Sequence, residues 1–89
     1  MSYEWHERKR LLNEGKHGFD FEHAKALFDG RKVITVLSKQ RGEPRYVTTG
    51  IVKNEFVTLV WTPRKGKVRF ISFRRARNEE KKAYKKLFS

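Results

Sequence analysis

The sequence predicts a small α+β domain in which two N-terminal helices and a C-terminal helix pack on a four-stranded antiparallel sheet. Apolar residues recur at helical spacing near both ends of the chain, whereas residues 33–73 alternate in polarity or are rich in β-branched side chains. Short turn signals separate these central segments, which favours a meander of consecutive strands. With 89 residues, the chain is expected to form one domain, residues 1–89, around a single thin core.

Two helices are expected before the first strand. The first spans residues 5–14 and ends in a glycine-containing turn, residues 15–18. The second spans residues 21–28, with Asp20 as its N-cap and Gly30 beyond its end. Apolar residues recur at helical spacing in this second segment, so one face of it is expected to lie on the sheet.

The four strands are expected at residues 33–37, 45–52, 55–62 and 67–73. Lys53-Asn54 forms a tight turn between the second and third strands. Residues 63–66 form the next turn, because Pro63 sets φ and Gly66 tolerates a positive φ. The strands are therefore expected to form an antiparallel sheet.

The last expected strand carries cations at its edge and leads to the final helix. Alternation places Val68 and Phe70 on one face, and Arg69, Ile71 and Phe73 on the other. After this strand, Asn78 is a suitable cap for a helix that continues through Phe88. Its apolar residues form a modest stripe among lysines, which is typical of a surface helix.

Composition limits the compartment and the chemistry of the protein. The chain has no cysteine, so neither a disulfide nor a thiolate zinc site is expected. Its N-terminus lacks the basic-then-apolar pattern of a signal peptide, and no apolar run approaches the roughly 18 residues of a membrane span. We therefore expect a soluble, cytoplasmic protein with no membrane partner.

The net charge of +12 is concentrated in the second part of the chain. Residues 1–30 hold five Lys or Arg against six Asp or Glu, a sum of −1, whereas residues 31–89 hold seventeen against four, a sum of +13. No acidic residue occurs between Phe56 and Asn78. Such an asymmetric field favours nucleic acid as the partner, followed by an acidic protein and then an anionic membrane surface. Charge alone does not rank the first two.

The residues offer little support for metal or nucleophilic-serine chemistry. His6, His17 and His23 lack a spacing typical of metal ligands, and no Ser-His-Asp signature is present. We therefore expect no metal and no cofactor. His17 lies in a Lys-His-Gly turn from which it can reach a substrate, although capping the preceding helix is the commoner role for such a residue.

A cluster of cations follows the third expected strand: Arg64, Lys65, Lys67, Arg69, Arg74, Arg75 and Arg77. Attack of an RNA 2′-hydroxyl on the adjacent phosphate needs stabilisation of a dianionic transition state, and arginine can bond two phosphate oxygens at once. Each arginine alone is more simply explained as a solvated or ion-paired strand residue. As a cluster they favour phosphate binding. Glu43 can act as a base or anchor Arg45, and Tyr84 can donate a proton, stack on a base or pack in its helix.

Short motifs of specific order and spacing run along nearly the whole chain: Glu4-Trp5, Asn13, Lys16-His17-Gly18, Phe21-Glu22, Ala24, Phe28-Asp29, Gly42-Glu43, Arg45, Gly50, Thr62, Arg64, Arg69, Ile71-Ser72, Arg74, Ala76 and Tyr84. This pattern resembles the BrnT family of toxins from type II toxin-antitoxin systems, whose fold is similar to that of the RelE-type ribonucleases. The chain departs from the family pattern at His6, where an acid is usual, at Phe73, where a small residue is usual, and at Pro44, since the family usually has no proline between the acid and the arginine.

The resemblance implies a metal-independent endoribonuclease that inhibits translation. It also implies an antitoxin, encoded by an adjacent gene, through which the complex binds operator DNA. The expected roles are phosphate stabilisation by Arg64, Arg69 and Arg74, which the turn between their strands brings to one end or face of the sheet. Glu43, His17 or Tyr84 would move protons.

Six further cations are the expected RNA-binding residues: Lys16, Arg45, Lys65, Lys67, Arg75 and Arg77. Two other functions fit the same charges. One is a basic module that binds nucleic acid without catalysis, for which the basic strands suffice. The other is a protein that only docks an acidic partner.

Overall fold

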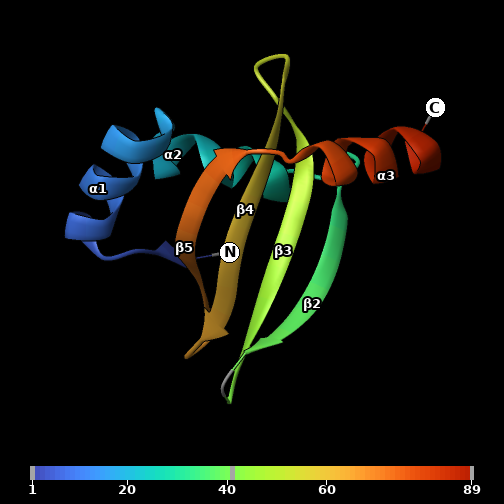
Figure 1. The fold of residues 1–89 in the computed structure, drawn as a ribbon. Helices are drawn as coiled ribbons and strands as arrows, with labels where there is room; N and C mark the ends of the chain where they lie inside the picture. The colour runs from blue at the N-terminus through green and yellow to red at the C-terminus, as the bar shows by residue number, and fades with distance from the viewer. Residues whose placement is uncertain (1, 41, 89) are drawn as a thin grey trace.

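The computed structural model describes residues 2–40 and 42–88, which form a five-stranded sheet with the strand order β1-β5-β4-β3-β2 (Figure 1). In chain order the elements are β1 (Tyr3–Glu4), α1 (Glu7–His17), α2 (Phe21–Ala24), the 3₁₀ helix η1 (Lys25–Phe28), β2 (Ile34–Gln40), β3 (Glu43–Val52), β4 (Glu55–Arg64), β5 (Lys67–Arg75) and α3 (Asn78–Phe88). Among these described residues, no helix is both long enough and apolar enough to cross a membrane.

The predicted fold class is wrong in its sheet, which is mixed and not four-stranded and antiparallel. The short strand β1 precedes the helices and pairs in parallel with β5, with Tyr3 opposite Val68 and Glu4 opposite Arg69. Two residues are too few to display the alternation that identifies a strand. What holds β1 in place is tertiary: the rings of Tyr3 and Trp5 both pack on Phe70, with centroids 5.4 and 5.7 Å away.

The first helix differs from its expected bounds, whereas the second helical segment keeps residues 21–28 but changes its geometry along its length. Because β1 occupies residues 3–4, α1 begins at Glu7, where the His6 ring accepts a hydrogen bond from the Arg8 N–H. The second helix starts after its predicted cap, since Asp20 accepts from the Glu22 N–H. It then tightens to 3₁₀ geometry after Ala24, a common way for a short helix to end.

The four longer strands form an antiparallel meander. Tight turns at Lys53-Asn54 and Lys65-Gly66 join β3 to β4 and β4 to β5, and all four of these residues have positive φ. Positive φ at both central residues is typical of the type I′ turn, whose twist matches that of paired strands. The second turn is therefore shorter than predicted, and Pro63 and Arg64 belong to β4.

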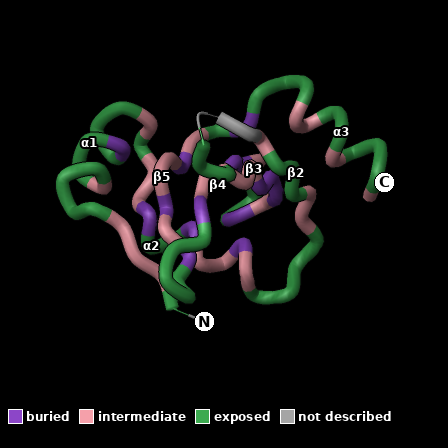
Figure 2. The backbone as a smooth tube through the Cα atoms, turned by 90° about the horizontal axis from the view of Figure 1, so that it is seen from below, coloured by how far each residue is buried: buried purple, intermediate pink, exposed green. Residues whose placement is uncertain are grey.

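The hydrophobic core lies between the sheet and the α2–η1 segment. Phe21 and Leu27 from this segment are buried with Leu59 and Phe70 of the sheet. Figure 2 shows buried stretches on the central strands, whereas α3 is mostly exposed. In Figure 1 the chain leaves β5 and crosses in front of β4 and β3 to reach α3, while η1 lies behind the sheet. We call the face that carries α3 the open face.

A β-bulge in β5 decides which side chains reach the open face. Trp61 pairs with Phe70, but the preceding residue of β4, Val60, pairs with Ser72, so Ile71 is an extra residue. Beyond the bulge the alternation is reversed. Phe73 is therefore buried in the core with Phe70, and the expectation that it shares a face with Arg69 is wrong.

The edge of β5 beyond β1 is covered by α1. The buried side chain of Asn13 accepts a hydrogen bond from the Phe73 N–H at 3.0 Å and donates one to the Phe73 carbonyl at 2.8 Å. It also donates to the Phe19 carbonyl. One amide thus supplies both bonds that a further strand would have made, and it fixes α1 against the sheet.

Candidate active site

A pocket of about 410 Å³ opens on the open face of the sheet. Four cations and one imidazole surround an apolar floor formed by Val47 and Val60. The full lining is Lys16, His17, Ser38, Arg45, Val47, Val60, Ser72, Arg74 and Arg77. Such a concentration of donors and positive charge suits a phosphate-bearing ligand.

Strand register brings the sheet residues of this pocket together. Arg45 pairs with Ser38 of β2, and Val60 pairs with both Val47 and Ser72. Residues that pair directly across strands share a face. Arg74 joins them because of the bulge: without Ile71 as an extra residue, it would alternate onto the core face.

The end of α1 brings Lys16 and His17 to the same pocket. The helix stops at Gly18, which has a φ of 74° and donates its N–H to the Glu14 carbonyl at 2.8 Å. Gly18 thus closes the helix, and the imidazole of His17 faces the pocket. The Asn13 contact one turn earlier anchors this end of α1 to β5.

The surroundings of His17 favour its neutral form. Burial lowers the pKa of this imidazole from its usual 6.5, and the nearby charges of Lys16 and Arg74 lower the pKa further. All three effects disfavour a second positive charge in a cationic pocket. At neutral pH the ring therefore has a free nitrogen that can accept a proton.

Arg74 is held by Glu80, a residue that the sequence did not single out. The guanidinium donates to both carboxylate oxygens, at 2.8 and 3.0 Å, and the two side chains are only 15% and 18% exposed. Glu80 also accepts from the Thr58 hydroxyl and the Arg77 N–H. Glu80 lies three residues after Arg77, which is the spacing of a helix capping box. The sequence therefore indicates a helix-capping role for Glu80, but not its contact with Arg74.

The Glu80 carboxylate remains charged over the whole physiological range. Burial alone would raise its pKa, but the hydrogen bonds from Arg74 and Arg77, the Arg74 charge and the Thr58 hydroxyl together lower the pKa from 4.5 to about 2. Arg74 is therefore oriented by a fixed anion at one end of its guanidinium. Its position in the pocket lining leaves it adjacent to any bound phosphate.

Other predicted cations lie away from this pocket. Arg64, Lys65 and Lys67 gather at the β4–β5 turn, where Arg64 and Lys67 pair across the hairpin. Arg69 shares the open face but forms an ion pair with Glu4 at 2.5 Å, and this hydrogen bond lowers the pKa of Glu4. The structure therefore does not gather Arg64, Arg69 and Arg74 around one phosphate.

The distance along β5 separates Arg74 from the cations of the β4–β5 turn. Arg74 lies seven residues beyond Lys67, so an extended strand places it roughly 23 Å from the hairpin turn.

Arg75 is two-thirds exposed, lies 3.9 Å from Glu55 and stacks near the Phe19 ring. It is not part of the pocket lining.

Two of the three proton-transfer candidates also lie outside the pocket. Glu43 is exposed at the start of β3. Tyr84 donates its hydroxyl to the Lys32 carbonyl at 3.1 Å, and its ring packs between Phe56 and Phe88. Tyr84 thus holds α3 on the sheet, and His17 is the candidate that lines the pocket. Within residues 2–40 and 42–88, no three His, Asp or Glu side chains gather as a metal site would require.

The fold and the pocket together define a small α+β protein with a cationic pocket on one face of its sheet. Residues 5–80 match the model of a family described as the ribonuclease toxin, BrnT, of type II toxin-antitoxin system. The match spans most of the chain, which therefore belongs to this family of ribonuclease toxins. Membership implies RNA as the target and a cognate antitoxin as the partner. A search of curated proteins found no match.

Proposed function

We propose that this chain is a metal-independent endoribonuclease that cleaves RNA in the cationic pocket and thereby inhibits translation. The observation that carries the proposal is the convergence of His17, held neutral, with Arg74, held by Glu80. In-line attack by a 2′-hydroxyl requires a base for its proton and cations for the charge that develops on phosphate. This pocket offers both from its own side chains.

The reaction can be assigned to residues of the pocket. His17 takes the proton of the 2′-hydroxyl as the new 2′-oxygen–phosphorus bond forms. Arg74, with Arg45 and Arg77 beside it, stabilises the dianionic phosphorane. The bond from phosphorus to the 5′-oxygen then breaks, and the Lys16 ammonium donates a proton to that oxygen. The products are a 2′,3′-cyclic phosphate and a free 5′-hydroxyl.

The cations at the β4–β5 turn are better placed to bind RNA than to act on the scissile phosphate. Arg64, Lys65 and Lys67 are exposed there, roughly 23 Å along β5 from Arg74. A strand of RNA that occupies the pocket and runs along β5 would reach them with a neighbouring phosphate. These residues would then contribute affinity and salt dependence rather than rate.

The cellular setting follows from family membership together with the charge of the chain. We expect the toxin to act in the cytoplasm, where RNA under translation is found. We expect the antitoxin to cover the cationic face of this chain, because an inhibitor has to neutralise that surface. With this face covered, the complex would bind operator DNA through the antitoxin.

The test is incubation of the purified chain with a long RNA in the presence of a chelator. Cleavage into fragments with 2′,3′-cyclic phosphate ends is the expected result. Tight RNA binding without cleavage would favour the non-catalytic module instead. Cleavage that appears only when a divalent metal ion is added back would contradict the proposed chemistry. Arrest of protein synthesis in a cell-free translation extract would link the activity to translation.

A further inference from the structure

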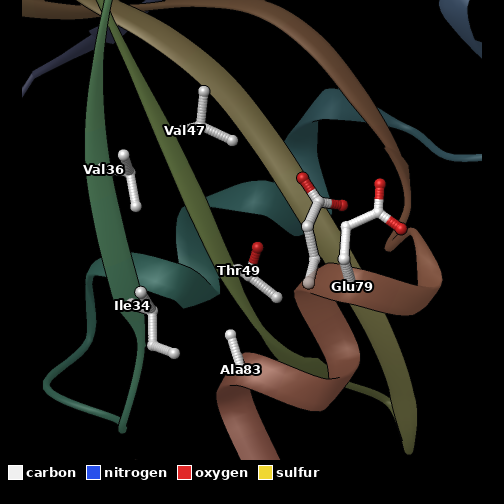
Figure 3. A pocket seen from close by; sticks show the side chains of 7 residues that line it. Ile34, Val36, Val47, Thr49, Glu79 and Ala83 are labelled. Atoms are coloured by element: carbon white, nitrogen blue, oxygen red, sulfur yellow. The ribbon is translucent and has the colours of Figure 1, made fainter.

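An apolar groove lies beside the pocket, between α3 and the strands β2 and β3. Its volume is about 270 Å³, and Figure 3 shows Ile34 and Val36 on one side and Ala83 on the other. Val47 and Thr49 complete its floor, and Glu79 and Glu80 stand at the start of α3. The lining is mainly hydrocarbon, unlike that of the neighbouring pocket.

The groove and the pocket adjoin each other at Val47. Val47 lines both of them, and Glu80, which lines the groove, holds Arg74, which lines the pocket. A ligand in the groove therefore ends beside the catalytic cations. The groove is also open along the sheet edge, because β2 is the last strand in the sheet order.

This edge leaves large apolar side chains in water. Val36 is 57% exposed and Leu37 is 47% exposed. An outer strand also offers backbone N–H and carbonyl groups for pairing with an extended peptide. Apolar side chains beside such an edge are typical of a surface that another protein covers.

We propose that the antitoxin docks an extended segment here, with an apolar side chain in the groove and acidic side chains against Arg45 and Arg77, so that it closes the pocket. The proposal rests on the proposed function, because it treats the neighbouring pocket as the active site. Charge complementarity identifies the partner. Within residues 2–40 and 42–88, no ion pair involves Lys16, Arg45 or Arg77, so an acidic segment would meet uncompensated cations.

Two other occupants fit less well. RNA would have to place the face of a base in the groove, and the Glu79 carboxylate at its rim would repel the flanking phosphates. A second copy of the chain would bring together two molecules of charge +12, with their cationic pockets side by side. An acidic, partly apolar protein segment satisfies both halves of the surface.

The experiment compares Val36→Lys with Leu12→Lys in binding to the antitoxin encoded by the adjacent reading frame. Both residues are exposed leucine- or valine-type side chains, 57% and 64% exposed, and both changes add one positive charge. Leu12 lies on α1, away from the groove. The added charge favours an acidic partner in general, so a loss of affinity has to come from the groove.

Val36→Lys is expected to weaken antitoxin binding by about tenfold or more, whereas Leu12→Lys leaves it unchanged. RNA cleavage without antitoxin is expected to be the same for both variants and the wild type, which separates this test from that of the proposed function. Equal antitoxin affinity for both variants would overturn the proposal. So would a wild-type homodimer that Val36→Lys dissociates, since the groove would then belong to a second copy.

Discussion

His17 shares its pocket with Lys16 and Arg74, and this proximity disfavours the charged form of the imidazole. A histidine capping a surface helix would be charged through part of the physiological pH range. Here burial and two neighbouring cations lower its pKa, so the neutral base is present when the pocket is otherwise fully charged. In the proposed mechanism the cations therefore have two roles: they attract phosphate, and they keep the His17 base unprotonated.

The rate of RNA cleavage should follow the titration of His17. Because the pKa of His17 lies below its usual 6.5, the neutral form dominates at and above that pH and is lost only in more acidic solution. We expect the single-turnover rate to be flat near neutrality and to fall in acid. His17→Ala should reduce the rate by about 10²–10⁴-fold and remove the acidic limb of the profile.

His23→Ala is the matched control, because His23 is an exposed histidine next to Lys53 and outside the pocket. Its pH–rate profile should coincide with that of the wild type. If His23→Ala loses the acidic limb, or if His17→Ala cleaves at the wild-type rate, His17 is not the base.

At the scale of elements, the site depends on how β5 and α1 are joined. The bulge turns Arg74 to the open face, and the Asn13 side chain fixes α1 where its last turn reaches the pocket. The bulge and the Asn13 contact together bring Lys16 of α1 and Arg74 of β5 to the same pocket.

Asn13→Ala should destabilise the protein by about 2–4 kcal/mol in free energy of unfolding, because it leaves the N–H and carbonyl of Phe73 without partners in a buried place. Urea denaturation followed by fluorescence measures this. Leu12→Ala, at the neighbouring exposed position, should change the free energy of unfolding by no more than about 0.5 kcal/mol. Equal midpoints for the two variants would argue against the Asn13 contact.

The sequence predicted the local features of the fold and missed those set by distant contacts. Strands with clear alternation and helices with a cap, such as the one after Asp20, were expected close to where they occur. The two-residue β1 and the extra residue Ile71 left no periodic signal, since both depend on tertiary packing. The bulge alone made the predicted orientation of Phe73 wrong.

The candidate site was predictable in composition and not in arrangement. Charge asymmetry indicated a phosphate-binding surface, and Lys16, His17, Arg45, Arg74 and Arg77 were among the candidates. The sequence could not tell that Arg64 and Arg74 lie far apart along one hairpin. It also gave no reason to prefer Glu80, because a capping-box glutamate usually bonds only the backbone at its helix start.

For the molecule as a whole, positive charge is divided between a pocket and a hairpin end. A net charge of +12 favours long-range attraction of RNA, and in the proposed function the two groups of cations have different roles once RNA binds. Arg74 would meet the transition state, whereas Arg64 would hold a phosphate elsewhere on the strand. The proposed function thus requires catalysis at one end of β5 and RNA binding at the other.

Single-turnover cleavage and RNA affinity of Arg74→Ala and Arg64→Ala test that claim most directly, with both measured in chelator over a series of salt concentrations. Arg74→Ala should lose about 10²-fold or more in cleavage rate at saturating RNA while most of its affinity remains. Arg64→Ala should cleave at the wild-type rate once saturated, with weaker binding and a salt dependence smaller by about one phosphate contact. The reverse pattern, with Arg64→Ala deficient in cleavage and Arg74→Ala as active as the wild type, would contradict the assignment of the active site to the pocket.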